Sequence, residues 1–263
     1  MSRRTPPCRI VSLVPSLTEA LFALGLGDRV VGVTDWCVHP AQAVEALPKV
    51  GGTKTPDRAR IAELEPDLVL ANREENRRRD VELLVGEGLQ VWVTYPRSVR
   101  EAVALLAELA DLGATPEARS RVLEPIEAAL RTAAVRSPKP PIRVFCPIWK
   151  DPWMAVGGDT YADDLLQVCG GQNVFAARSE RRYPIVTPQE IVEAAPEVIL
   201  LPDEPYAFGP REVAELSRLP LPASEAGRIH PIDGTLVSWY GPRIAQAIET
   251  IGDLLRGKER GSG

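Results

Sequence analysis

The chain has 263 residues, 44% hydrophobic and 25% charged, a composition typical of globular proteins and long enough for one large core or two smaller ones. Its formal net charge of −5 argues against a nucleic-acid partner, because such proteins carry a basic excess. No apolar run reaches the roughly 18–20 residues that a membrane-spanning helix requires, so we expect no spanning segment.

The first residues lead directly into a predicted strand, without the apolar core of an export signal. We therefore expect a cytoplasmic protein, or a periplasmic or cell-surface one whose export segment was removed or is not part of this chain. The four cysteines lie far apart and show no CxxC spacing, which argues against a zinc site. Cys146 and Cys169 are expected to be buried, whereas Cys37, in a predicted loop, is the thiol with potential reactivity.

The first half of the chain alternates predicted strands and helices. We expect strands at residues 10–14, 29–33, 68–71 and 90–94, and helices at 17–24, from Thr55 onward, at 76–86 and at 98–112. Ser16 or Thr18 is expected to cap the first helix. Pro56 is predicted at the first position of the second helix, with Asp57 in its first turn.

A long helix is predicted in the middle of the chain, from Thr115 to about Val135. Twenty helical residues span about 30 Å. Pro125 lies inside this segment and is expected to kink it or to mark a short break.

The second half repeats the alternation. Strands are expected at residues 143–147, 198–201 and 228–232, and helices at 161–169, 187–194, 211–218 and 240–256.

Two segments about 130 residues apart share one pattern: Thr-Pro, an amphipathic stretch, a Pro followed by an acidic residue, and a buried strand. The first begins at Thr55 and the second at Thr187. The repetition predicts two α/β lobes with parallel sheets, residues 1–114 and 139–263, joined by a backbone helix at 115–138. A single doubly wound sheet is the alternative. Clefts between lobes commonly bind small molecules.

Many of the aromatic residues follow predicted strands, where ligands gather in parallel α/β sheets. This placement favours a wide, flat and largely apolar ligand, although several rings could instead fill the contact between lobes. The residues concerned are Trp36, Trp149, Trp153, Tyr206, Phe208, Trp239 and Tyr240, together with Tyr183, which precedes the helix predicted at 187–194.

Motifs for metal binding or catalysis are missing from the sequence. The two histidines, His39 and His230, each precede a proline and are expected to be surface or strand-end residues. His39 remains a candidate axial ligand for a metal macrocycle. There is no phosphate-binding loop, GxSxG or HExxH motif, so we expect no enzyme and no intrinsic cofactor or metal. Glu74 and Glu75 form a carboxylate pair that we place at an exposed helix start, where the helix dipole favours them.

Five segments carry a resemblance to a known family: RIVSLVPSLTE at 9–19, VGVT at 31–34, IAELEPDLVL at 61–70, LQVCGGQNVF at 166–175 and GPRI at 241–244. Their order and spacing resemble the ABC-importer binding proteins that carry cobalamin, haem and siderophores, a class III periplasmic-binding-protein fold. Within this family the chain is most similar to the cobalamin receptors.

The resemblance implies a rigid two-lobed monomer that binds a small metal chelate, a cobalt-containing corrinoid or another chelate, and delivers it to an ABC-importer permease. Glu74 or Glu75 in one lobe and Glu204 in the other would dock on the permease. The cobalamin receptors have aromatic residues at Thr53 and Asn72, so the first half of the cleft is more polar here. The positions implied to face the ligand are Thr53, Asn72, Trp149, Trp153, Tyr183, Trp239 and Tyr240.

Three functional hypotheses remain open at this point. The first is a receptor for a corrinoid, with haem or a ferric siderophore as alternatives. The second is a cytosolic enzyme or sensor on the same scaffold that modifies or senses a corrinoid. The third is a pair of lobes that docks a partner through its glutamates and binds no small molecule.

Overall fold

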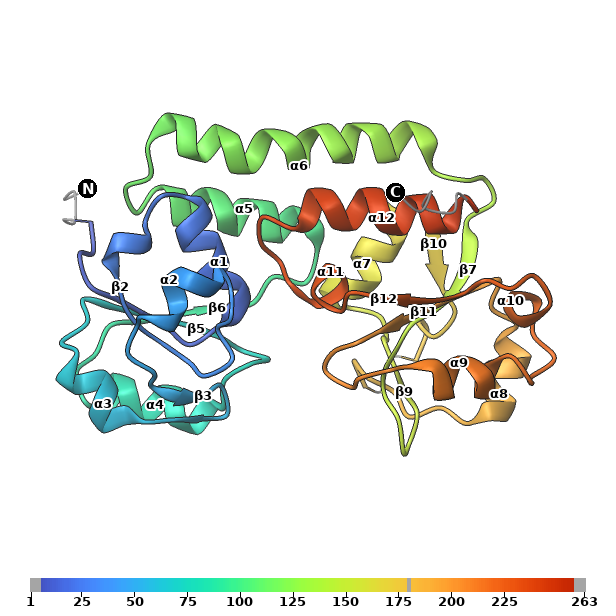
Figure 1. Cartoon of the computed structure of the whole chain (residues 1–263), viewed down its shortest axis with the longest axis horizontal. Helices are drawn as coiled ribbons and strands as arrows, with labels where there is room; N and C mark the ends of the chain where they lie inside the picture. Colours follow the sequence, from blue (N-terminus) through green and yellow to red (C-terminus); the bar gives the residue numbers. More distant parts are fainter. Residues whose placement is uncertain (1–5, 179–180, 258–263) are drawn as a thin grey trace. The chain divides into compact units, whose positions relative to one another are not determined.

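A computed structural model describes residues 6–178 and 181–257 of the chain (Figure 1). They form two compact lobes. The first lobe comprises the chain up to Pro96 with Glu101–Glu124 and Tyr240–Pro242, and the second comprises Arg97–Arg100, Pro125–Trp239 and the chain from Arg243. The protein is therefore an α/β protein of two parallel-sheet lobes, and helix α6 (Pro116–Arg136) runs from one into the other.

The first lobe is built on a four-stranded parallel sheet in the order β2-β1-β5-β6. Helices α1 and α5 cover one face of the sheet, and α3 and α4 cover the other (Figure 1). A short antiparallel hairpin, β3–β4, follows α2. The elements are β1 (Ile10–Ser12), α1 (Pro15–Ala23), a 3-10 turn (Gly27–Arg29), β2 (Val30–Val33), α2 (Ala41–Glu45), β3 (Gly51–Gly52), β4 (Thr55–Pro56), α3 (Arg58–Glu63), β5 (Leu68–Asn72), α4 (Arg78–Gly86), β6 (Val91–Thr94) and α5 (Val99–Ala110).

The second lobe repeats this plan with a parallel sheet in the order β10-β7-β11-β12. Helices α7 and α12 lie on one face and α8 and α9 on the other (Figure 1). An antiparallel hairpin, β8–β9, follows β7. The elements are β7 (Ile142–Phe145), β8 (Pro147–Trp149), β9 (Met154–Ala155), α7 (Tyr161–Val168), β10 (Gly171–Asn173), α8 (Pro188–Ala194), β11 (Val198–Pro202), α9 (Pro210–Leu216), α10 (Pro222–Glu225), β12 (Ile229–Ile232), α11 (Thr235–Ser238) and α12 (Ile244–Leu255).

The repeated sequence pattern makes the same contact in both lobes. In the first lobe the backbone N–H of Asp67 donates to the carbonyl of Arg9, and the Asp67 carboxylate accepts from the Arg9 N–H at 2.9 Å. In the second lobe the N–H of Glu197 donates to the carbonyl of Arg143, and the Glu197 carboxylate accepts from the Arg143 N–H at 2.9 Å. The acidic residue after the proline therefore fixes the register of neighbouring strands, β5 on β1 and β11 on β7.

Several of the expected helix starts are wrong. The closing helix, expected from residue 240, begins at Ile244. Neither Ser16 nor Thr18 caps α1, because the helix begins two residues earlier than expected, at Pro15, and the Thr18 hydroxyl donates to the Ser12 hydroxyl at 2.9 Å. The helix expected from Thr55 begins at Arg58, since Thr55 and Pro56 pair with β3. Asp57 is its N-cap: its carboxylate accepts from the N–H of Arg60 at 3.1 Å.

The proline inside the long helix does not break it. Helix α6 continues from Pro116 to Arg136 through Pro125.

The expectation that the Cys37 thiol is reactive is also wrong, because its side chain is buried between the hydroxyls of Thr18 and Thr34. Burial raises the pKa of the Cys37 thiol, so this group is not an accessible nucleophile.

Candidate functional site

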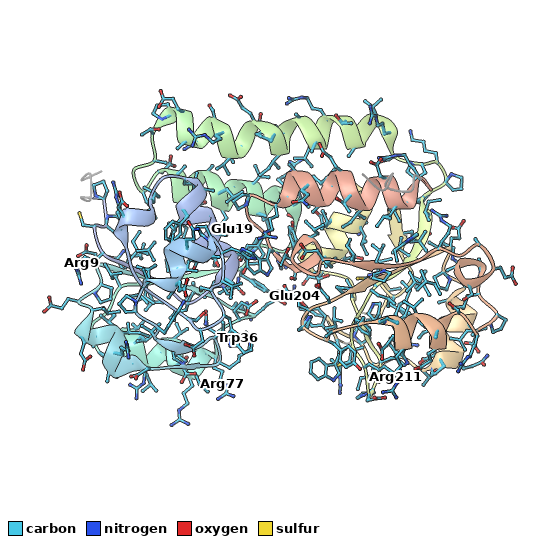
Figure 2. All side chains as sticks on the ribbon, viewed as in Figure 1. Arg9, Glu19, Trp36, Arg77, Glu204 and Arg211 are labelled. Atoms are coloured by element: carbon cyan, nitrogen blue, oxygen red, sulfur yellow. The ribbon has the colours of Figure 1, made fainter. Side chains whose placement is uncertain are left out.

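The first lobe places one exposed aromatic ring beyond the end of β2. Trp36 lies in the loop between β2 and α2 with 66% of its surface exposed (Figure 2). Its indole borders the β3–β4 hairpin, where a Cβ on Gly52 would lie 3.6 Å from the Trp36 Nε1. Removing the apolar surface of an exposed indole from water is favourable, so Trp36 is suited to contact an apolar ligand.

Asn72, at the carboxyl end of β5, is buried, and both ends of its amide bind protein groups. Its Nδ2 donates to the carbonyl of Thr94 at 3.0 Å. Its Oδ1 accepts from the N–H groups of Glu74 and Glu75 at 2.8 and 3.3 Å. Asn72 therefore shapes the turn that carries the two glutamates. These glutamates lie in that turn and not at a helix start as expected, since α4 begins only at Arg78.

Asn76 completes this network and was missed by the sequence reasoning. Its Oδ1 accepts from the N–H of Asn72 at 2.8 Å, and its Nδ2 donates to the carbonyl of Thr53 at 2.9 Å. Thr53 is itself almost fully buried. The only sequence signal for such a role was an asparagine a few residues after a strand end.

Tyr240 belongs to the first lobe, although its neighbour Trp239 belongs to the second. Burial raises the pKa of the Tyr240 phenol well above its usual value, and the negative charge of Glu75 acts in the same direction. Hydrogen bonds to the side chains of Ser16 and Thr94 partly oppose this shift. Tyr240 thus holds the segment Tyr240–Pro242, which connects α11 to α12 in the chain, on the first lobe.

The second lobe carries a connected row of aromatic rings at the β8–β9 hairpin. Trp149 is 43% exposed and meets Tyr206 edge-on, with ring centroids 5.6 Å apart. Tyr206 contacts Phe208 at 4.7 Å, and Phe208 stacks on Trp153 at 5.7 Å with an interplanar angle of 6°. Trp153 is only 6% exposed and lies in the hydrophobic core of the lobe. The row therefore connects an exposed ring to the core.

Trp239, directly after α11, meets Glu204, two residues after the end of β11. The Trp239 Nε1 and the Ser238 hydroxyl each donate to Oε1 of Glu204 at 2.8 Å. The guanidinium of Arg243 lies 5.1 Å from the Trp239 ring centroid, within cation–π range. Glu204 is half-buried (Figure 2). Arg243 belongs to the GPRI segment, and its position over the indole follows from the fold and not from that motif.

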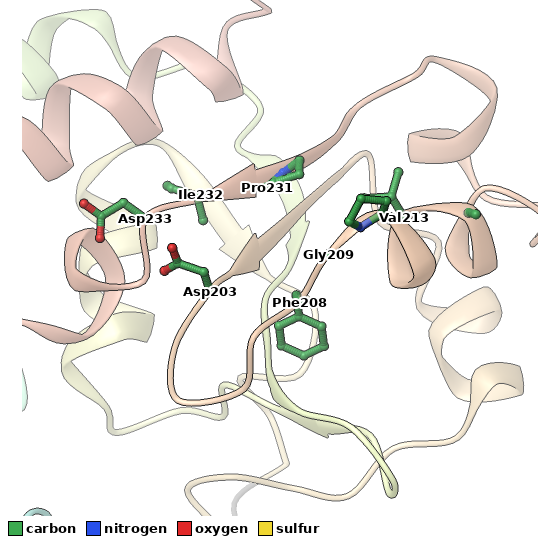
Figure 3. A pocket seen from close by; sticks show the side chains of 9 residues that line it. Asp203, Phe208, Gly209, Val213, Pro231, Ile232 and Asp233 are labelled. Atoms are coloured by element: carbon green, nitrogen blue, oxygen red, sulfur yellow. The ribbon is translucent and has the colours of Figure 1, made fainter.

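A pocket of about 750 Å³ opens within the second lobe, between α9 and the ends of β11 and β12 (Figure 3). Asp203 and Asp233 line one end, and Phe208 and Val213 line the other. The Asp203 carboxylate accepts from the N–H of Gly234 at 2.7 Å. A side chain at Gly234 would collide with Glu204, so this glycine allows the two strand ends to approach closely.

Metal-binding residues do not converge anywhere in the described part of the chain: no three His, Cys, Asp or Glu side chains are arranged to hold an ion. Tyr183 is half-buried in the segment that leads to α8. Within residues 6–178 and 181–257, no helix has the length and apolar character needed to cross a membrane.

The family model described as periplasmic binding protein matches residues 10–229. The chain belongs to this family. The membership confirms the expectation of a binding protein and not an enzyme. The two separate sheets described above exclude the alternative of a single doubly wound sheet.

Named relatives are similar in sequence to this protein over most of its chain. The vitamin B12-binding protein of Vibrio cholerae is 26% identical over 257 residues, covering 97% of this chain and 92% of the relative. The vitamin B12-binding protein of Yersinia pestis is 30% identical over 194 residues, covering 73% of this chain and 69% of the relative.

Solved structures show the same architecture. The periplasmic vitamin B12 binding protein BtuF of Vibrio cholerae superposes with a TM-score of 0.82 at 25% identity, covering 97% of this chain and 99% of BtuF. The periplasmic heme-binding protein BhuT, solved with two hemes, superposes with a TM-score of 0.77 at 27% identity, covering 95% of this chain and 98% of BhuT. The class III periplasmic-binding-protein fold expected from the sequence is thus confirmed.

Proposed function

We propose that this protein is the substrate-binding receptor of an ABC importer, that it works in the periplasm or at the cell surface, and that its ligand is a corrinoid. The observation that carries the proposal is the exposure of Trp36 and Trp149 beyond the sheet strands of their lobes. Relatives named for vitamin B12 binding, similar along nearly the whole chain, support the choice of ligand.

The exposed rings suit such a ligand physically. A corrinoid presents a broad, largely apolar face, and burying an indole against it removes apolar surface from water at about 25 cal/mol per Å². We propose that Trp36, Trp149 and Tyr183 contact the ligand. Five further residues expected at the ligand are buried, and we propose that they hold the contacting residues in place: Thr53, Asn72, Trp153, Trp239 and Tyr240.

Haem is the second candidate ligand, supported by the similarity to BhuT. A haem iron usually takes an axial protein ligand. His39, three residues after the exposed Trp36, is the residue we propose for that role if haem is bound. A ferric siderophore is a third possibility of the same receptor class.

We further propose that Glu74, Glu75 and Glu204 dock on the permease. The turn held by Asn72 displays the first two. The two hydrogen bonds to Glu204 both end on its Oε1, which leaves Oε2 for an arginine of the partner. Partly exposed charges of this kind set orientation and encounter rate more than affinity.

Tryptophan fluorescence tests the ligand. The purified protein is titrated with cyanocobalamin, cobinamide, haem and a ferric siderophore, and Trp36→Ala and Trp149→Ala are compared with the wild type. Saturable quenching by corrinoids that both substitutions weaken supports the proposal. Trp92→Phe is the control, because Trp92 lies inside β6. A response to haem alone, lost in His39→Ala, would replace the corrinoid by haem, and a flat response to all four ligands would refute the receptor function.

A further inference from the structure

Lys150 is a buried lysine next to the exposed Trp149. Only 5% of its surface is exposed, which is unusual because lysine is rarely buried unless its charge is paired. It lies in the turn of the β8–β9 hairpin, and the Nζ is 5.0 Å from the centroid of the Trp153 ring.

Two glutamates of α9 pair with this lysine. The Nζ forms an ion pair and hydrogen bond with Oε2 of Glu215, and Oε1 of Glu212 lies 3.9 Å away. Glu212 is also buried, and its Oε2 accepts from the N–H of Gly209 at the start of α9 at 3.0 Å. A buried charge without its partners costs several kcal/mol, so the hairpin turn and α9 must stay together.

Trp149 depends on this attachment for its position. Its ring is 43% exposed and gains little from the core. Its backbone pairs with Met154 in a hairpin of only two short strands, and its ring leans on Tyr206 from the loop that leads to α9. A short hairpin has little stability of its own. The lysine is the residue directly after Trp149, and it connects the same hairpin to α9.

We propose that Lys150 is a positioning residue of the ligand site. Its ion pairs with Glu215 and Glu212 hold the hairpin on α9, so that Trp149 stands against Tyr206 before any ligand arrives. Lys150 acts through Trp149, since its own side chain is enclosed. The part of the inference that concerns ligand affinity rests on the proposed function, and the part that concerns the hairpin does not.

Hydrogen exchange on the ligand-free protein tests the hairpin. In Glu215→Gln we expect the backbone N–H groups between residues 148 and 155 (Pro152 has none) to exchange about tenfold faster, while those of α12 stay unchanged, because only local opening becomes easier. Glu87→Gln is the matched control: Glu87 pairs with Arg58 in the first lobe, and its side chain is 40% exposed, as is that of Glu215. Unchanged exchange in the hairpin, or an equal rise in α12, would overturn the proposal.

Ligand titration of the same variants tests the consequence for binding. If the competent arrangement of Trp149 is less populated, the apparent Kd rises in proportion, and we expect a rise of about fivefold in Glu215→Gln. In a Trp149→Ala background the Glu215→Gln change should have no further effect, because the lysine acts only through that ring. Additive losses would contradict this. If the wild type binds none of the ligands, the proposed function fails, whereas the exchange data still decide whether Lys150 holds the hairpin.

Discussion

The indole Nε1 of Trp239 donates a 2.8 Å hydrogen bond to Oε1 of Glu204. One bond thus joins a buried residue proposed to support the ligand site to a residue proposed to dock on the permease. The next residue, Tyr240, is buried in the first lobe, where Glu75 contributes to the raised pKa of its phenol. Two neighbouring residues thus interact with acidic positions: Trp239 binds Glu204 within the second lobe, and Tyr240 is affected by the charge of Glu75 within the first.

Replacing Glu204 should weaken the second lobe as well as docking. In Glu204→Ala, Trp239 and Ser238 lose their shared acceptor, and the free energy of unfolding should fall by about 1.5–3 kcal/mol, the range for hydrogen bonds to a charged group. Glu204→Gln keeps an oxygen acceptor and should lose less than half of that. Urea denaturation measures both, and equal midpoints for the two variants would contradict the structural role of the bond.

The two kinds of tryptophan should respond differently to truncation. Trp153→Ala removes a stacked core ring and should lower the free energy of unfolding by about 3–5 kcal/mol. Trp36→Ala removes an exposed ring and should change it by less than about 0.5 kcal/mol while weakening ligand binding. Thermal or urea unfolding beside ligand titration separates the effects. A large loss of stability in Trp36→Ala would show that this ring is structural.

The stabilisation from Glu190 should disappear in acid. A hydrogen bond from Arg178, with others from the N–H and hydroxyl of Thr187, lowers the pKa of Glu190 from 4.5 to about 2. Because the pKa is lower in the folded state than in the unfolded chain, the contribution is complete above pH 4.5 and is lost as the pH falls from 4.5 towards 2.

Comparison of the wild type with Glu190→Gln measures this loss. Their urea midpoints should differ near neutral pH and converge at about pH 2–3. The capping box of α8, formed by Thr187 and Glu190, is the structural element that loses its charged acceptor. A difference that stays constant over the whole pH range would contradict the lowered pKa.

Thiol titration should separate Cys8 from the other three cysteines. Burial raises the pKa of both Cys146 and Cys169 to about 12, and it raises that of Cys37 as well, whereas Cys8 is exposed. The native protein should therefore react quickly with Ellman's reagent at about one thiol, and at all four in denaturant. Cys8→Ser should abolish the fast phase. A fast phase that survives this substitution would mean that a buried thiol becomes accessible.

The repeated Pro-acidic pattern made the two-lobed fold predictable. Asp67 and Glu197 bind only the adjacent strand. The apolar runs that follow them are buried on both faces, as is typical of strands in the middle of a parallel sheet. Helix starts were less predictable. Thr55 and Pro56 resemble a helix start in sequence, but pairing with Gly51 and Gly52 draws them into a hairpin. The strand β10 was missed because its polar residues gain stability only from their neighbour β7.

The sequence by itself determined the order of strands and helices, the duplication, and the occurrence of aromatic residues after strands, because these depend on local periodicity and chain breaks. Only the tertiary structure decided which aromatic rings are exposed and which are core, since Trp149 and Trp153 follow the same strand and differ only in what packs on them. The burial of Lys150 between the hairpin and α9 has the same origin. Its partners are 62 and 65 residues away, and pairings over that distance are set by the packing of the folded lobe, which local sequence does not encode.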